Sequence, residues 1–110
     1  ALIESPDLYV VHDGSQAARV AFAVAEEMRD AGFAVQLHAG GGNFKAQMKR
    51  ADGSGAQLAL IIGEDEVSAD AVTVKPLREA RAQVRVGRDE LALQVADFLL
   101  GDEDENDGNL

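Results

Sequence analysis

The sequence lacks cysteine and tryptophan entirely, and it has only two prolines among its 110 residues. Without cysteine, neither a disulfide framework nor a thiolate metal site can form, and this absence fits a reducing cytoplasm. No apolar run approaches the ~20 residues that a membrane-spanning helix needs, and no basic-then-apolar leader opens the chain. We therefore expect a cytoplasmic protein that contacts no membrane.

The 110 residues leave room for one domain with one hydrophobic core. The first residue is Ala1, where a natural initiator would be methionine. We therefore expect the sequence to be a piece cut from a longer polypeptide.

Negative charge dominates the composition, with a net charge of −10 at pH 7. At first sight this argues against a nucleic-acid partner, because phosphates repel acids. Five of the 20 acids, however, lie in residues 101–109, a run that has no base and almost nothing apolar to bury. The sequence therefore predicts a domain over residues 1–100 and an acidic disordered tail over residues 101–110. Within the domain, the local arrangement of lysine and arginine matters more than total charge.

Apolar runs of strand length alternate with helical patterns along the first half of the chain. Strands are expected at residues 8–11, 33–37 and 57–62. Helices are expected between them, one capped by Ser15 and stopped by Gly32, and one beginning near Asn43. In the second helix, Phe44 and Met48 should face the core. The order strand–helix–strand–helix–strand implies parallel pairing.

The second half of the chain has a different pattern. Residues 72–75 and 83–86 alternate apolar and polar side chains, so each run should form a strand with one buried face and one wet face. The valines of both runs should point inward, with Lys75 and Arg85 on the wet face.

A final amphipathic pattern completes the expected fold. A helix is expected from a cap at Asp89 to Leu100, and Gly101 should end it. The sequence thus predicts an α/β fold of three layers with three helices. Its mixed five-stranded sheet would hold three parallel strands and an antiparallel pair at one edge.

The loops after the expected parallel strands carry small or polar residues. In open α/β sheets, ligands bind outside the carboxyl ends of the strands. Residues 40–42 are three glycines that lead into a helix, whose free N–H groups and positive dipole end suit an anion. They match neither GxGxxG nor the Walker loop, since Asn43-Phe44-Lys45 follows them. The segment is therefore either an anion-binding turn or simply a flexible one.

The cations of the domain fall into two main groups. Lys45 and Lys49 are four residues apart and share a helix face, with Arg50 beside them. The second group comprises Lys75, Arg78, Arg81 and Arg85. Either group could hold the phosphates of an RNA backbone. The alternatives are a role in solubility for the first group and pairing with nearby acids for the second.

The acids and histidines indicate no catalytic or metal site. Residues 64–66 are consecutive acids, but no candidate nucleophile or fixed histidine accompanies them. They form either a solvated loop or part of an RNA pocket, since a carboxylate can accept from base N–H groups. His12 and His38 are too few for a metal site, and Asp13 lacks the companions that a phospho-accepting receiver domain requires.

One long segment carries a family resemblance. At GGGNFKAQMKRADGSGAQLALIIGEDEV, residues 40–67, the sequence resembles the C-terminal anticodon-binding domain of bacterial histidyl-tRNA synthetases, which are class II enzymes. The resemblance extends to PDLYVV at residues 6–11 and to VTVKPLR at residues 72–78, and it continues to about Leu100. It implies a mixed five-stranded sheet with three helices that binds the anticodon stem-loop of histidine tRNA.

The resemblance also implies what surrounds this domain. The parent would be a homodimeric histidine–tRNA ligase whose catalytic core uses ATP and magnesium to attach histidine to tRNA. None of that catalytic machinery is present in the sequence, so the fragment should need no cofactor and should be inactive in aminoacylation. Histidine tRNA and the parent's catalytic domain are the expected partners, with no DNA and no membrane.

The resemblance assigns roles to individual residues. In related class II synthetases, an acid at the position of Glu66 and a base at the position of Lys75 approach the anticodon bases. The glycine turn and the start of the following helix would hold the RNA backbone, so that splayed loop bases can be read. The expected RNA-binding residues are Gly41, Gly42, Asn43, Lys45, Lys49, Arg50, Glu66, Lys75 and Arg78.

Residues 68–71 depart from the family pattern, which usually has a glycine-containing turn there. Glycine suits a positive φ, although aspartate tolerates one better than most residues do. We therefore expect a modestly altered turn around Asp70.

Two other functions stay open at this point. Synthetase-like domains also occur in proteins without ligase activity, so a protein-interaction or regulatory domain is the main alternative. A small flavodoxin-like nucleotide-binding domain is a weaker one, because the phosphate-binding loop is missing.

Overall fold

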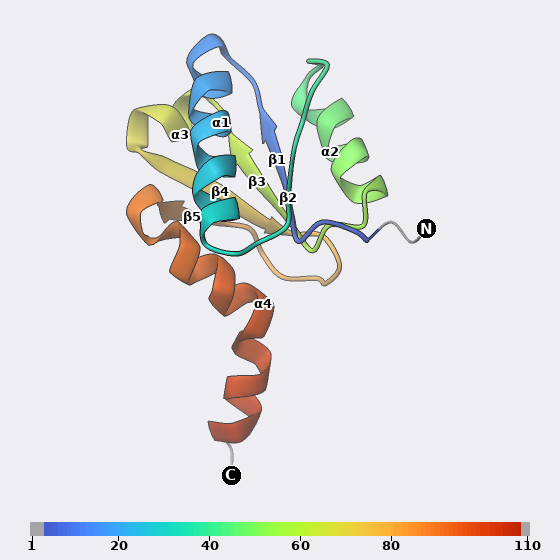
Figure 1. Cartoon of the computed structure of the whole chain (residues 1–110), viewed down its shortest axis with the longest axis vertical. Coiled ribbons are helices and arrows are strands. Elements are labelled where there is room, and N and C mark those ends of the chain that lie inside the picture. Colours follow the sequence, from blue (N-terminus) through green and yellow to red (C-terminus); the bar gives the residue numbers. More distant parts are fainter. Residues whose placement is uncertain (1–3, 109–110) are drawn as a thin grey trace.

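The computed structural model describes residues 4–108 of the chain. Strands and helices alternate along most of it, and a long helix closes it (Figure 1). In chain order the elements are β1 (Leu8–His12), α1 (Ser15–Asp30), β2 (Val35–Leu37), α2 (Phe44–Gly53), β3 (Leu58–Ile62), α3 (Glu64–Ala69), β4 (Ala71–Pro76), β5 (Val84–Gly87), the 3-10 helix η1 (Arg88–Glu90) and α4 (Leu91–Gly108).

The strands form one mixed sheet in the order β2-β1-β3-β4-β5. β1 pairs in parallel with β2 and β3, while β4 is antiparallel to β3 and β5 is antiparallel to β4. The predicted α/β sheet, three parallel strands with an antiparallel edge pair, is therefore confirmed. β2 begins at Val35 rather than at Phe33, because the N–H of Phe33 still closes α1 by donating to the Met28 carbonyl at 3.1 Å.

Helices cover both faces of the sheet, which confirms the three-layer prediction. On one face, Leu8 and Val10 of β1 pack in the larger core with α1 and with Leu91 of α4. Successive strand residues point to opposite faces. Tyr9 therefore points to the other face, where it packs in a smaller core with Ala51 of α2. Figure 1 shows α1 and α2 on either side of β1.

A short helix, α3, occupies residues where the sequence predicted a loop. It was missed because six residues, half of them acidic, show no apolar period. Glu64, Asp65 and Glu66 form its first turn, where the positive end of the helix dipole favours negative charge. Asp70 ends the helix in the left-handed conformation, with a φ of 52°. Aspartate thus adopts the left-handed conformation at the turn that lacks glycine, and an altered geometry relative to the family stays a prediction.

Two of the predicted helix starts are wrong. The N-cap position of α1 is occupied by Gly14, not Ser15, and no side chain caps this helix. α4 begins after the 3-10 helix Arg88–Glu90, which contains the predicted cap Asp89. Asn43 does cap α2, as predicted.

The strand alternation of β4 and β5 has two exceptions, because Thr73 is buried on the face predicted to be wet and Val84 is exposed. Val72 and Val74 are fully buried and Val86 is nearly so, but Val84 is 45% exposed. Val84 begins β5, and an edge strand has a paired neighbour on one side only. Val84 shares the core face with its register partner Val74, as predicted, but it is not buried there.

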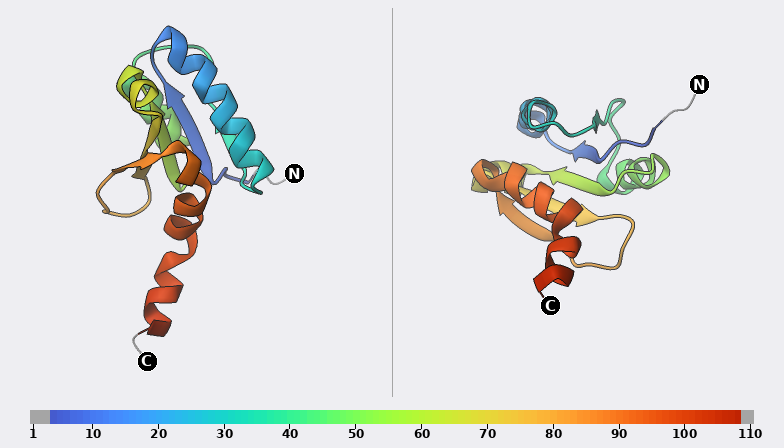
Figure 2. Two further views of the ribbon diagram at one scale, coloured as in Figure 1. Left: turned by 90° about the vertical axis from the view of Figure 1, so that its left-hand side faces the viewer. Right: turned by 60° about the horizontal axis from the view of Figure 1, so that its bottom comes forward.

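The final helix is longer than the sequence predicted. α4 continues through Gly101 to Gly108, and its second half projects away from the sheet (Figures 1 and 2). One glycine costs a helix only about 1 kcal/mol, and glutamate is a good helix former. Residues 109–110 of the predicted tail lie outside the described residues, and the division into a domain and an acidic tail stays a prediction. No helix in the described part of the chain is long and apolar enough to cross a membrane.

Candidate nucleic-acid interface

The triglycine turn lies at the edge of the sheet where the parallel strands end. Gly40, Gly41 and Gly42 have φ angles of 100°, 71° and 93°, a region that side chains with a Cβ rarely adopt. Asn43 follows in extended conformation, and its Oδ1 accepts from the N–H of Ala46 at 2.9 Å. The conformation of the turn thus explains why glycine fills these three positions.

A fully buried glutamine fixes this turn to the end of β1. The Nε2 of Gln47 donates to the carbonyls of His12 at 2.7 Å and Gly42 at 2.8 Å. Its Oε1 accepts from the N–H of His12 at 2.9 Å. Sequence reasoning missed Gln47, although its place on the stripe of Ala51 was a signal. Phe44, predicted to face the core, is only half-buried.

Two further buried side chains support the same turn. The Tyr9 hydroxyl lies 2.8 Å from Nδ1 of His38, and Nε2 of His38 lies 2.7 Å from the Gly41 carbonyl. A carbonyl only accepts, so His38 donates from Nε2 and Tyr9 donates to Nδ1. Burial raises the pKa of the Tyr9 hydroxyl, and the positive charge of Arg50 partly opposes this. The conformation of the turn is thus set by side chains beneath it.

The predicted phosphate-binding cations are exposed on α2. Lys45, Lys49 and Arg50 all lie at its surface. Lys49 and Arg50 line an open hollow of about 700 Å³, together with Tyr9 and Gln36. These cations are therefore available to a partner, although their binding to phosphate stays a prediction.

The sheet presents a second group of side chains beside α2. By register, Ile61, Thr73 and Arg85 lie side by side on β3, β4 and β5. Lys75 lies two residues from Thr73 and therefore points to the same face, as Ala59 opposite it does. This is the α2 face of the sheet, since Ala59 packs in the smaller core with α2. We call the surface formed by Ile61, Thr73, Lys75 and Arg85 the open sheet face.

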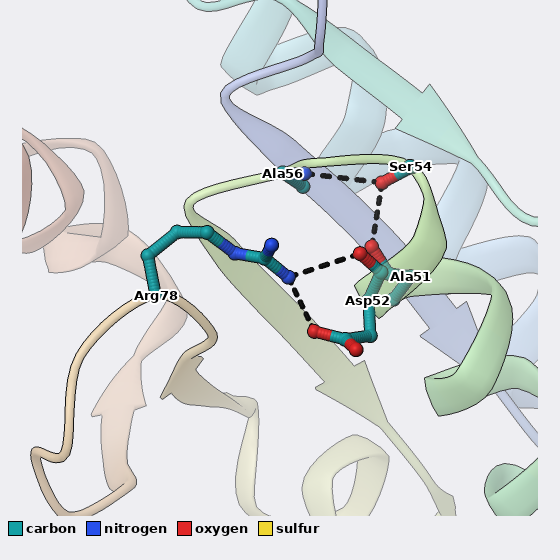
Figure 3. Close-up of polar contacts among 5 residues, drawn as sticks. All are labelled: Ala51, Asp52, Ser54, Ala56 and Arg78. Carbon is teal, nitrogen blue, oxygen red and sulfur yellow. Dashed lines mark hydrogen bonds and ion pairs between the residues drawn. The ribbon is translucent and has the colours of Figure 1, made fainter.

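Contacts at both ends of α2 show that this helix flanks the open sheet face. At its start, a Cβ on Gly63 would lie 3.3 Å from the ring of Phe44, so α2 and α3 begin close together. At its end, Arg78 forms an ion pair with Asp52 and donates to the Asp52 carbonyl at 3.0 Å (Figure 3). The face is therefore bounded by α2 on one side and α3 at one end.

Glu66 lies on α3 at the edge of the open sheet face, and protein groups hold its carboxylate. One oxygen accepts from the N–H of Gly63 at 2.9 Å. The other accepts from the Thr73 hydroxyl at 2.8 Å and from Arg85 at 3.0 Å. Burial alone would raise the pKa of Glu66, but these hydrogen bonds outweigh it and hold the pKa below its ordinary value. Glu66 is therefore ionised at neutral pH.

The second basic group of the sequence is divided by the fold. Arg78 pairs with Asp52 and Arg85 with Glu66, while Arg81 lies 4.6 Å from the centre of the Phe98 ring and also pairs with Glu79. For these arginines, pairing with acids is what the structure shows. Lys75 is exposed, and in residues 4–108 no ion pair holds it.

The acids and histidines form no metal site in the part of the chain that the structure describes, since no three of them gather in one place. His12 and His38 instead serve the triglycine turn. Nε2 of His12 lies 3.1 Å from the His38 carbonyl, to which it donates. Both histidines thus have structural partners.

The family of the chain is established by comparison with known proteins. A family model described as an anticodon binding domain matches residues 7–97. The chain belongs to the anticodon-binding domain family. The match includes all five strands, so the domain of this family is the sheet with its covering helices.

Histidine–tRNA ligases are among the relatives of this domain. It is 53% identical to the histidine–tRNA ligase of Aromatoleum aromaticum over 105 residues, which are 96% of this chain and 24% of that protein. It is 63% identical to that of Nitrosomonas europaea over 81 residues, 74% of this chain and 19% of that protein. The domain thus spans a quarter or less of the length of these relatives.

Solved structures share the fold. Apo S. aureus histidyl-tRNA synthetase matches with a TM-score of 0.75 and 28% identity over 84% of this chain and 23% of that chain. The histidyl-tRNA synthetase of Nostoc sp. PCC 7120 matches with a TM-score of 0.75 and 27% identity, over 83% of this chain and 22% of that chain. The RNA binding domain of Cryptosporidium parvum threonyl-tRNA synthetase gives 0.77 at 20% identity, over 84% of this chain and 23% of that chain, and shows the fold alone.

Proposed function

We propose that this domain binds the anticodon stem-loop of histidine tRNA on behalf of a histidine–tRNA ligase. The observation that carries the proposal is the open sheet face, where exposed Lys75 and Arg85 lie beside a helix with exposed cations, in a chain of the anticodon-binding family. The net charge of −10 does not oppose it, because RNA responds to the local charges of the face that it meets. The regulatory alternative finds no support among the relatives named above.

The parent enzyme supplies the chemistry in this proposal. Its catalytic core, which uses ATP and magnesium, attaches histidine to the tRNA that this domain holds, in a cytoplasmic homodimer. The ligase relatives support this assignment, since the domain matches less than a quarter of their length. The domain alone contains no catalytic residue in the proposal and needs no cofactor. ATP-dependent histidylation of tRNA by the 110-residue chain would contradict it.

Two groups of residues divide the binding of the RNA. Phosphate contacts position a nucleic acid, whereas base contacts select its sequence. The positioning group comprises Gly41, Gly42, Asn43, Lys45, Lys49, Arg50 and Arg78. Glu66 and Lys75, which the resemblance assigns to the bases, lie at the open sheet face where splayed loop bases would rest.

A salt titration tests the proposal. The affinity for a labelled anticodon stem-loop RNA is measured by fluorescence anisotropy over about a tenfold range of salt concentration, from roughly 20 to roughly 200 mM. The logarithm of the binding constant should fall linearly with the logarithm of salt. Lys45→Gln and Lys49→Gln should each reduce the slope by about 0.7–0.9, the value per phosphate contact.

A matched control removes an exposed cation from another part of the surface. Arg19→Gln on α1 changes the net charge by the same amount, but α1 covers the opposite face of the sheet. Its slope should equal that of the unaltered chain. Equal slopes for all three variants would contradict the assigned phosphate contacts, and no binding at low salt would contradict the function itself.

A further inference from the structure

The carboxylate of Glu66 has little capacity left for an RNA base. A carboxylate offers about four acceptor sites. Gly63, Thr73 and Arg85 already donate to three of them, at 2.9, 2.8 and 3.0 Å. The side chain is only 12% exposed. Glu66 is thus built as an anchor within the protein more than as a surface acceptor.

Arg85 has the opposite character. Its guanidinium has five N–H donors, of which one is given to Glu66. Within the described residues no other hydrogen bond of its side chain is formed, and the side chain is 49% exposed. By register it lies opposite Thr73, on the same face as Lys75. Free donors of a fixed guanidinium therefore lie on the open sheet face.

The anchor distinguishes this arginine from the other paired arginines. In the pairs Arg29–Glu26 and Arg78–Asp52 the acids are 51% and 68% exposed, so those carboxylates can move in solvent. Such exposed pairs hold their partners weakly. The carboxylate beside Arg85 is instead fixed by the start of a helix and by a strand hydroxyl. A cation held in this way loses less freedom when it meets a ligand.

We propose that Arg85 determines specificity by contacting a guanine of the anticodon loop, and that Glu66 is the residue that positions it. The inference rests on the proposed function. An arginine fork matches the O6 and N7 acceptors of guanine, and in single-stranded RNA loops these edges are accessible. Lys75 beside it lacks the fork geometry and supplies a single charge.

The test removes one acceptor from the RNA. Guanines of the anticodon loop are replaced one at a time by 7-deazaguanine, which has a C–H in place of N7. The unaltered chain should lose about tenfold in affinity at one guanine, a factor that corresponds to 1.4 kcal/mol and lies within the range of a good bidentate contact. Arg85→Gln should bind the RNA with that guanine and the RNA with 7-deazaguanine in its place equally well. Arg85→Lys should keep the salt slope and lose the discrimination.

The role of Glu66 is tested in combination with Arg85. Glu66→Gln keeps the side-chain length and one oxygen that accepts from Gly63, but its amide cannot accept from Arg85 on the other side. It should reduce the discrimination, and Glu66→Gln combined with Arg85→Gln should match Arg85→Gln alone. Circular dichroism at the binding temperature shows whether each variant is folded, and Thr73→Val gives a second way to loosen the carboxylate.

Each outcome has a distinct meaning. If the unaltered chain discriminates but Arg85→Gln discriminates equally, the role of Arg85 is wrong and the proposed function stands. If Glu66→Gln lowers the discrimination further in the Arg85→Gln background, Glu66 contacts the base itself and the positioning role is wrong. Binding without sensitivity to any 7-deazaguanine overturns the guanine contact alone. A lack of binding by the unaltered chain overturns the proposed function with it.

Discussion

Replacing Gln47 should destabilise the protein far more than the replacement of a typical polar residue, because Gln47 is fully buried. Gln47→Met keeps the volume of the side chain, so it leaves no large cavity in the core. It removes three hydrogen bonds, two to His12 and one to Gly42, at a site that solvent does not reach. The structure thus predicts a large decrease in the free energy of unfolding from a substitution that conserves side-chain volume.

The magnitude follows from those three bonds. Each contributes about 0.5–1.5 kcal/mol net, so the free energy of unfolding should fall by about 3 kcal/mol. For a domain near this size, that corresponds to a decrease in Tm of about 10–15 °C. Urea unfolding followed by circular dichroism at 222 nm measures the loss, provided that the m-value is unchanged.

A glutamine on the surface supplies the control. Gln94→Met changes the same side chain on the exposed part of α4 and should alter the stability by less than about 0.5 kcal/mol. If Gln47→Met and Gln94→Met are equally stable, the buried hydrogen bonds of Gln47 do not hold the triglycine turn, and the reasoning on that turn is refuted.

Three further outcomes are expected. Gly42→Ala should cost about 1–2 kcal/mol in urea unfolding, because φ is positive there and the added Cβ has room, whereas Gly53→Ala on α2 should cost nothing; equal effects would contradict the backbone argument. Tyr9 is the only tyrosine, so absorbance at 295 nm should show its ionisation above pH 10, and Arg50→Gln should move it higher still. Glu66 contributes stability that is complete above pH 4.5 and is lost as the pH falls through its lowered pKa. The stability difference from Glu66→Gln should therefore be constant at neutral pH and shrink as the pH falls below 4.5, and a difference that grows in acid would contradict the lowered pKa.

Much of the fold could be predicted because it depends on local patterns. Residues 57–62 are apolar enough to be buried on both faces, and β3 at the centre of the sheet is such a strand. The alternation at residues 72–75 gave β4 with Val72 inward and Lys75 outward. Periodicity failed where a segment is short or ends in solvent, as at α3 and Val84. The end of α4 was also misplaced. Glycine and charged residues make a helix less stable, but they do not by themselves end it.

The candidate site was predictable only in part. The triglycine turn and the exposed cations of α2 could be predicted, because a glycine run before a helix and lysines four residues apart are patterns of residues close in the sequence. Gln47 could have been noticed as a polar residue on a buried helix stripe. Its partner His12 could not, since it is 35 residues away.

The sequence by itself determined the order of the five strands and three of the helices, the family and the residues that could carry charge to an RNA. Only the tertiary structure decided which of those charges remain free. The antiparallel register brings Arg85 beside Thr73, and α3 places Glu66 against both, although 19 residues separate Glu66 from Arg85. Whether an acid serves a base or anchors an arginine depends on that three-dimensional contact, because a carboxylate has a limited number of acceptor sites and the fold fills them first.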